Sequence, residues 1–199
     1  DGFEFKNLVP QMYIPSFMRE KLGYSTHAMV SMPVLNPHTP INTGFDSFKL
    51  MESHNNMAAM LDEMSFSKEH PSFYLLNIGE THYPYATPLE PENEWPRIHG
   101  VHGVFKHLDD HVVGGKIEDS DELSFFTQNQ LNELKDRQIE AIRYLDDVFE
   151  KLFDLVPENT YITVTSDHGE LFGEEGYFGH GPIMHEKVFE VPFLEGKLR

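Results

Sequence analysis

The sequence of 199 residues predicts an α/β fold in which helices flank a mostly parallel central sheet. Two apolar runs, residues 73–79 and 161–165, have the length and composition of strands buried on both faces. A long helical pattern precedes the second run, and a helix followed by a strand is typical of a parallel crossover. Because no repeat or low-complexity tract divides the chain, we expect a single domain over residues 1–199.

Short helical and strand patterns alternate in the first part of the chain. Residues 10–22 carry apolar side chains at helical spacing, and Gly23 is placed to end that helix. Phe45 and Phe48 are placed to anchor a loop to the core. The segments that follow Gly23 predict a strand, this loop, a helix and a strand over residues 24–32, 42–51, 55–64 and 71–79.

The second part of the chain begins with a segment of about 86–120 that has no sustained period and is rich in Pro, His and Gly. We expect an irregular excursion there, with one helical turn. Residues 122–156 then predict a long amphipathic helix, which Pro157 ends. Its predicted apolar stripe consists of Leu131, Leu134, Ile142, Leu145, Phe149, Leu152 and Val156.

The charge balance restricts the partners of this protein. Fifteen basic residues against 33 acidic ones give a net charge of −18, which repels nucleic acid and anionic membrane surfaces. No apolar run reaches the length of a membrane span, so we expect neither nucleic acid nor membrane as a partner. An anionic substrate needs bound cations that reverse the local field. The absence of cysteine excludes disulfides and thiolate metal sites, while localisation and oligomeric state stay open.

A carboxylate and an imidazole stand at the end of the second apolar run. Asp167 and His168 both reach one cation if the backbone turns at Gly169. Oxygen and nitrogen donors together favour zinc, manganese or iron over calcium. His180 lies beyond a glycine-rich loop and can fold back over the same metal or a bound anion. The alternative is that Asp167 caps a helical turn and the histidines are surface residues; the buried strand before the pair favours the metal site.

A second polar cluster follows the strand predicted at residues 71–79. Glu80, Thr81 and His82 stand at its carboxyl end, where ligands gather in parallel sheets, so we expect both clusters on one rim. Pro84 and the aromatic residues beside it would fix the orientation of His82. His82 then binds an anionic oxygen or acts as a general acid, or else is an ordinary loop histidine.

Other polar and sulfur-containing groups favour simpler interpretations. Four histidines at residues 99, 102, 107 and 111 match no tight metal-site spacing, and a solvated segment explains them better. Glu170, Glu174 and Glu175 favour a solvated acidic loop, with Glu170 as an alternative partner that orients a metal-bound histidine. Met57, Met60 and Met64 have the helical spacing of core residues.

Several motifs together resemble the sulfatase and phosphoesterase branch of the alkaline phosphatase superfamily. The segment NTYITVTSDHGELFGEEGYFGHG followed by EVPF resembles the carboxyl-terminal metal-binding part of that family. Upstream, four segments resemble the family in the same order: FMREKLGYSTHAMV, GFDSF, FYLLNIGETHYPY and RQIEAIRYLDDVFEKL. The resemblance spans most of the chain and is weakest from Ala86 to Ser120.

The resemblance implies an alkaline phosphatase-like fold and a metal-dependent hydrolase of sulfate or phosphate esters. It implies that Asp167 and His168 are ligands of a divalent metal, with manganese, zinc and calcium as candidates. His180 would be a metal or substrate-oxygen ligand, and His82 would bind the transferred sulfuryl or phosphoryl group. The implied partner is a small anionic ester, and the metal would activate a hydroxyl nucleophile and neutralise charge.

One part of the family pattern has no counterpart in this sequence. Family members place acidic metal ligands and a nucleophile well before the segment that matches LGYST, but only 22 residues precede Gly23. Ser16 lies on the predicted helix that leads into LGYST, and we do not assign it as the nucleophile. We therefore expect a fold truncated at the amino end that shows little or no turnover by itself. The alternative is a non-catalytic module with a partial metal site or a binding role; a purely structural acidic domain leaves the histidines unexplained.

Overall fold

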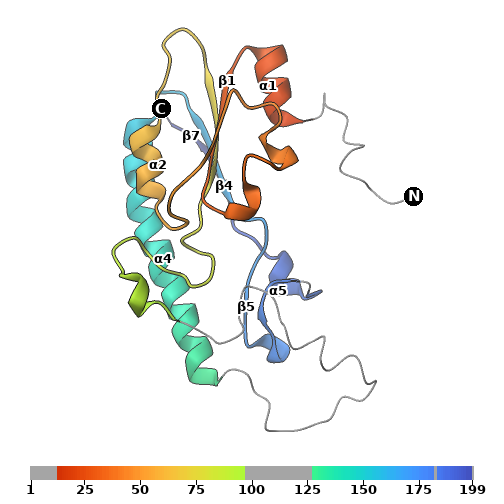
Figure 1. The fold of residues 1–199 in the computed structure, drawn as a ribbon, viewed down its shortest axis with the longest axis vertical. Helices are drawn as coiled ribbons and strands as arrows, with labels where there is room; N and C mark the ends of the chain where they lie inside the picture. Colours follow the sequence, from red (N-terminus) through yellow and green to blue (C-terminus); the bar gives the residue numbers. More distant parts are fainter. Residues whose placement is uncertain (1–12, 97–126, 182, 199) are drawn as a thin grey trace, which may run out of the picture. The chain divides into compact units, whose positions relative to one another are not determined.

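The computed structural model describes residues 13–96, 127–181 and 183–198 (Figure 1). The chain divides into two compact units. The first unit contains Asp1–Glu80 and Leu145–Pro157. The second contains Thr81–Tyr144 and Glu158–Arg199. The predicted histidine cluster of residues 99–111 lies outside the described residues, as does most of the irregular excursion.

The sheet of the first unit consists of three parallel strands in the order β2-β1-β3. Their bounds are Ser25–Val30 for β1, Ser47–Leu50 for β2 and Ser72–Asn77 for β3. The parallel sheet confirms the α/β class. Strand β2 falls within the predicted loop, so that prediction is wrong. Its short alternating pattern, with Ser47 and Lys49 exposed, carries too little apolar signal to indicate a strand.

Strand β3 is half-buried over all six residues, so its predicted burial on both faces is wrong. In the described part of the chain, β3 ends the order β2-β1-β3 and pairs only with β1. Every side chain of β3 keeps part of its surface exposed, so each face of the strand is only partly covered. The apolar run therefore predicted the strand correctly but not its environment.

Helix α1 spans Ile14–Leu22, and Gly23 ends it as predicted. Gly23 has a φ of +71°, and its N–H donates to the carbonyl oxygen of Met18. The helix packs closely on the loop before β2. A Cβ at Gly44 would lie 2.3 Å from the hydroxyl oxygen of Ser16, so glycine is required there. Ser16 is buried, with 9% of its surface exposed.

Helix α2 spans Met57–Glu63 and supplies the core on one side of the sheet. Asn56 caps it by accepting a hydrogen bond from the N–H of Ala59. Met60 is fully buried against Met29 and Met51, and Met64 packs on this cluster at its margin. The predicted core role of these methionines is confirmed.

Helix α4 spans Gln128–Leu155 and contributes to both units. Its buried positions are Leu131, Leu134, Ala141, Leu145, Val148 and Leu152. Ile142, which we predicted in the stripe, is 52% exposed. Ala141 and Val148 are buried instead, because they keep the spacing of three and four residues from Leu145 that places residues on one face of a helix. Position on the helix therefore decides which side chain is buried, and the size of the side chain does not. Among the described helices, none is long and apolar enough to span a membrane.

Strand β4 (Tyr161–Thr165) pairs antiparallel with β7 (Phe193–Lys197) in the second unit. The side chains of β4 alternate between exposed and half-buried, so its predicted burial on both faces is wrong. The physical reason is the alternation of Ile162 and Val164 with polar or aromatic neighbours, which suits a strand covered on one face. The antiparallel partner occupies one edge of β4, and the parallel crossover that we expected for this strand stays a prediction.

A small hairpin and several short helices complete the described residues. The hairpin consists of β5 (Leu171–Phe172) and β6 (Phe178–Gly179), and helix α5 follows at Glu186–Phe189. The 3-10 helices η3, η4, η5 and η6 span Pro33–Leu35, Pro40–Asn42, Glu92–Glu94 and Glu174–Gly176.

Candidate functional site

The hairpin β5–β6 brings Glu170 opposite His180. Its register pairs Leu171 with Gly179, so Glu170 and His180 flank the same end of the ladder. Gly179 has a φ of +88°, which turns the chain just before His180 and favours glycine. The His180 Nδ1 atom lies 3.0 Å from a carboxylate oxygen of Glu170.

An aromatic cluster docks the loop that carries His82 onto this hairpin. Tyr85 is 1% exposed and packs with Phe178 in a buried cluster that also includes Leu131 and Leu134 of α4. The Tyr85 and Phe172 rings lie 5.6 Å apart, and the Tyr83 and Phe178 rings lie 6.3 Å apart. This packing brings a loop far upstream in the sequence to the turn that carries His180.

Three predicted histidines lie together in the second unit. The His168 and His180 rings stack with their centroids 3.6 Å apart and an interplanar angle of 21°. The His82 and His180 ring centroids lie 6.3 Å apart. Asp167 stands beside them, with a carboxylate oxygen 3.6 Å from Nε2 of His168. The structure therefore brings all four predicted site residues into one neighbourhood.

Each of these histidines has its Nδ1 atom held by an oxygen acceptor. The acceptors are the carbonyl of Tyr83 for His82 at 2.7 Å, the carbonyl of Gly169 for His168 at 2.8 Å and the carboxylate of Glu170 for His180 at 3.0 Å. Carbonyl oxygens only accept hydrogen bonds, so Nδ1 of His82 and His168 carries the proton. Nε2 of each ring is left for a metal or a ligand.

Glu170 is withdrawn from solvent, with 9% of its side chain exposed. Our prediction of a solvated acidic loop is wrong for this residue, because the aromatic cluster covers it, but Glu175 is exposed. The hydrogen bond that His180 donates to Glu170 raises the pKa of His180, against the opposing effect of burial. Burial first, and then the charge of Glu170, raise the pKa of Tyr85.

Asp167 and His168 suit two positions of one metal site. Their donor atoms lie 3.6 Å apart, and two ligands at tetrahedral angles on a metal such as zinc lie about 3.4 Å apart. The Asp167 side chain is 86% exposed and accessible to a cation. Within residues 13–96, 127–181 and 183–198, no group of three or more acidic or histidine side chains forms a metal site. The metal-ligand role of His180 therefore stays a prediction.

Glu80 and Thr81 do not join the histidines as functional groups. Glu80 is fully buried and accepts a hydrogen bond from the N–H of Met57 at 2.6 Å, which caps helix α2. The Thr81 carbonyl accepts a hydrogen bond from Gln138 at 3.3 Å. Sequence reasoning missed the burial of Tyr85, for which the only sequence signal was the aromatic pair around Pro84.

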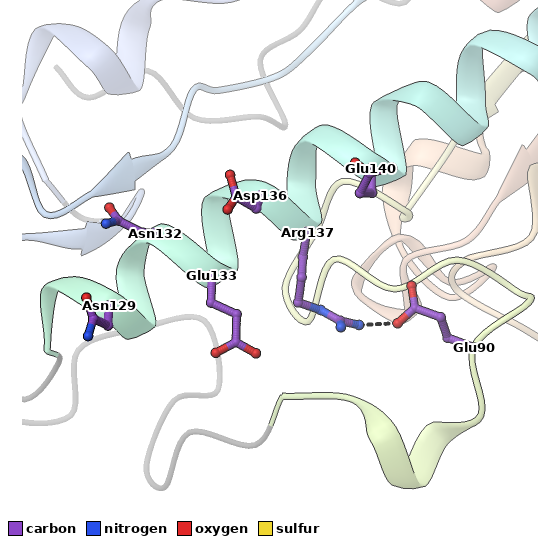
Figure 2. A pocket seen from close by; sticks show the side chains of 7 residues that line it. All are labelled: Glu90, Asn129, Asn132, Glu133, Asp136, Arg137 and Glu140. Atoms are coloured by element: carbon purple, nitrogen blue, oxygen red, sulfur yellow. Dashed lines mark hydrogen bonds and ion pairs between the residues drawn. The ribbon is translucent and has the colours of Figure 1, made fainter.

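A separate cavity of about 540 Å³ lies along α4 in the second unit (Figure 2). Arg137 points toward Glu90 across it, and the two form an ion pair. The lining consists of Glu90, Asn129, Asn132, Glu133, Asp136, Arg137 and Glu140, and includes no predicted site residue. Because four carboxylates face one guanidinium that is already paired, this cavity does not suit an anionic ester.

Comparisons with known proteins give one match. The family model described as Sulfatase matches residues 7–194, which is nearly the whole chain. Neither the curated proteins nor the solved structures contain a match to this sequence.

Proposed function

Because the chain belongs to the Sulfatase family, we propose that its histidine cluster serves metal-dependent hydrolysis of sulfate or phosphate esters. The observation that carries this proposal is the grouping of His82, His168 and His180 beside Asp167. Three imidazoles with Nδ1 anchored and Nε2 free suit the recognition of a cation and an anionic ester side by side.

Asp167 and His168 would hold the divalent metal. The Gly169 carbonyl fixes the tautomer of His168, so the Nε2 lone pair is available on the side of Asp167. When bound, the metal supplies Lewis-acid polarisation of the ester and neutralises its charge. Manganese, zinc and calcium remain the candidates, and the mixed oxygen and nitrogen donors favour the first two.

His82 and His180 would bind the oxygens of the sulfuryl or phosphoryl group. A protonated imidazole donates its Nε2–H to an anionic oxygen while Nδ1–H stays on its anchor. The nucleophile is assigned to no residue described above. Ser16 is unsuitable because it is buried on α1 against Gly44.

Metal titration of the purified chain tests the ligand assignment. We expect Mn²⁺ or Zn²⁺ to bind the wild type, and Asp167→Ala and His168→Ala each to weaken binding at least tenfold. Glu175→Gln, in the same hairpin but exposed, is the matched control and should bind as the wild type does. Unchanged binding in both ligand variants would remove Asp167 and His168 from the site.

Turnover of an aryl sulfate and an aryl phosphate separates the two functional classes. Metal-stimulated hydrolysis that is lost in His82→Ala supports the hydrolase. Metal binding without turnover of either ester supports the metal site and agrees with both the hydrolase and the non-catalytic module, because we expect little or no turnover from this chain by itself. Absence of both metal binding and turnover would contradict the hydrolase and the metal-binding module alike.

A further inference from the structure

His180 differs from the other two histidines in the acceptor that anchors its ring. Backbone carbonyls hold His82 and His168, whereas a carboxylate holds His180. A carboxylate side chain has rotational freedom that a carbonyl lacks, so it orients a ring only if its own position is restricted. Three features of the hairpin restrict Glu170.

The first feature is the ladder. Leu171 pairs with Gly179, which places Glu170 and His180 one residue beyond the last rung, on adjoining strands. The second is the close approach of the carboxylate to the turn at Gly179. A Cβ at Gly179 would lie 3.7 Å from the Glu170 carboxylate, so the carboxylate lies directly against this turn. The third is the low exposure of Glu170, 9% for its side chain, which limits replacement of the hydrogen bond by water.

Tyr85 is a further neighbour of the Glu170 carboxylate. Tyr85 is almost fully buried, and Glu170 is close enough to raise the pKa of its hydroxyl. The Tyr85 ring also lies 5.6 Å from Phe172, which follows Glu170 in the hairpin. The aromatic cluster that brings His82 to the site therefore also encloses Glu170.

We propose that Glu170 is a positioning residue that accepts the Nδ1–H of His180 and so presents Nε2 of this ring to the ester. The proposal rests on the proposed function for the identity of the ligand, but the orientation itself is a property of the free protein. Nε2 lies across the ring from Nδ1, so anchoring Nδ1 to Glu170 directs Nε2 away from the hairpin.

The stacking of His180 on His168 extends the effect of Glu170 to the metal side of the site. The two rings are 3.6 Å apart and nearly parallel. Rotation of His180 away from Glu170 would disrupt this stack and release a face of His168. Glu170 therefore positions the ester-binding ring and supports the metal-binding ring through it.

The test is the tautomer of His180 in the metal-free chain, read from long-range ¹H–¹⁵N correlation spectra above the titration range of histidine. The signals are assigned by their loss in His180→Gln. We expect the Nδ1–H tautomer in the wild type, although free histidine in water favours Nε2–H. In Glu170→Gln, which keeps the shape but removes the charge, the ratio of Nδ1–H to Nε2–H should fall about tenfold.

Glu175→Gln is the matched control, because it makes the same chemical change on an exposed residue of the same hairpin and should leave the tautomer unchanged. Glu170→Asp, one methylene shorter, should restore the Nδ1–H preference only in part. An Nε2–H tautomer in the wild type would overturn the proposal, and so would an Nδ1–H preference that survives in Glu170→Gln and Glu170→Ala. The wild-type measurement stands even if a variant fails to fold.

Kinetics distinguish this proposal from the proposed function. If the chain turns over an aryl ester, Glu170→Gln should raise KM for the ester more than it weakens metal binding. If the wild type shows the expected tautomer but binds no metal and hydrolyses no ester, the proposed function fails while the positioning role of Glu170 stands.

Discussion

Among the residues that the structure describes, Glu80 and Glu170 are withdrawn from solvent, and each makes a different kind of hydrogen bond. Glu80 accepts from a backbone N–H at the start of α2, and Glu170 accepts from the ring of His180. Burial raises the pKa of Glu80, and the backbone hydrogen bond from Met57 lowers it in part. A carboxyl group whose folded pKa is raised favours folding in acid and loses that contribution as the pH rises.

We predict that Glu80→Gln changes the pH dependence of stability. The unfolded state releases the Glu80 proton near its ordinary pKa of 4.5, whereas the folded state retains it to higher pH. The wild type should therefore lose stability relative to Glu80→Gln as the pH rises from about 4.5 through the raised folded value. Urea denaturation across this pH range measures the difference in unfolding free energy between the wild type and Glu80→Gln. The two free energies should converge below about pH 4.5.

Glu80→Ala serves as the contrasting variant. It removes the acceptor of the Met57 N–H and should be less stable than Glu80→Gln by about 1–3 kcal/mol at every pH, because neither variant has a titrating group at this position. If the difference in unfolding free energy between Glu80→Gln and the wild type is constant from pH 4 to pH 8, burial does not raise the pKa of this carboxyl group.

The hairpin β5–β6 is the element on which the site depends most directly. It contains only two residues in each strand, and the glycine at its end carries the backbone into His180. Its stability comes from outside its own ladder, since Phe172 and Phe178 pack against Tyr83 and Tyr85. An isolated hairpin of this length would not be stable in water.

We predict that Gly179→Ala destabilises the protein by about 1 kcal/mol and moves His180. The added Cβ meets nothing closer than 3.7 Å, so the cost arises from the φ of +88° and not from a steric clash. Gly196→Ala in β7 is the control, because nothing lies within 4 Å of its Cβ and its φ is not positive. Equal stability of the two variants, measured in urea, would show that the turn tolerates alanine.

Helix α4 gives a second test at the scale of elements. Leu134 is 2% exposed and packs with Tyr85 and Phe178, whereas Ile142 is 52% exposed on the same helix. Leu134→Ala should cost about 2–5 kcal/mol of unfolding free energy, and Ile142→Ala less than about 1 kcal/mol. The reverse order in chemical denaturation would mean that the helix presents its other face to the core.

At the scale of the whole molecule, charge is the dominant property. The net charge of −18 concentrates carboxylates on a chain of 199 residues, and their mutual repulsion opposes the compact state. The same field disfavours anionic ligands in general. An ester that binds beside Asp167 therefore needs the charge reversal that a metal would provide.

We predict that salt stabilises the protein at neutral pH. The urea midpoint should rise as NaCl increases from about 0.01 M to 0.5 M, because the Debye length falls from about 30 Å to a few ångströms. The control is the same titration near the isoelectric point of about 4.9, where the net charge is small and the effect should disappear. A midpoint that does not change with salt at pH 7 would show that repulsion contributes little.

The sequence predicted those features that have a long or specific local pattern. Helix α4, helix α2 and the strands β1 and β3 carry strong periodic signals, and Asp167 and His168 form a recognisable motif within a matched family. Strands β2, β5, β6 and β7 were not predicted. They are two to five residues long and are stabilised by partners elsewhere in the chain, so their own residues carry little signal.

The sequence by itself determined the residue types of the site and the family to which the chain belongs. Only the tertiary structure decided which residues meet: that Glu170 leaves solvent to hold His180, and that Glu80 caps a helix. The physical reason is that burial depends on packing between distant segments. Tyr83 and Tyr85 must dock on Phe172 and Phe178 before Glu170 is covered, and no local pattern around Glu170 encodes that contact.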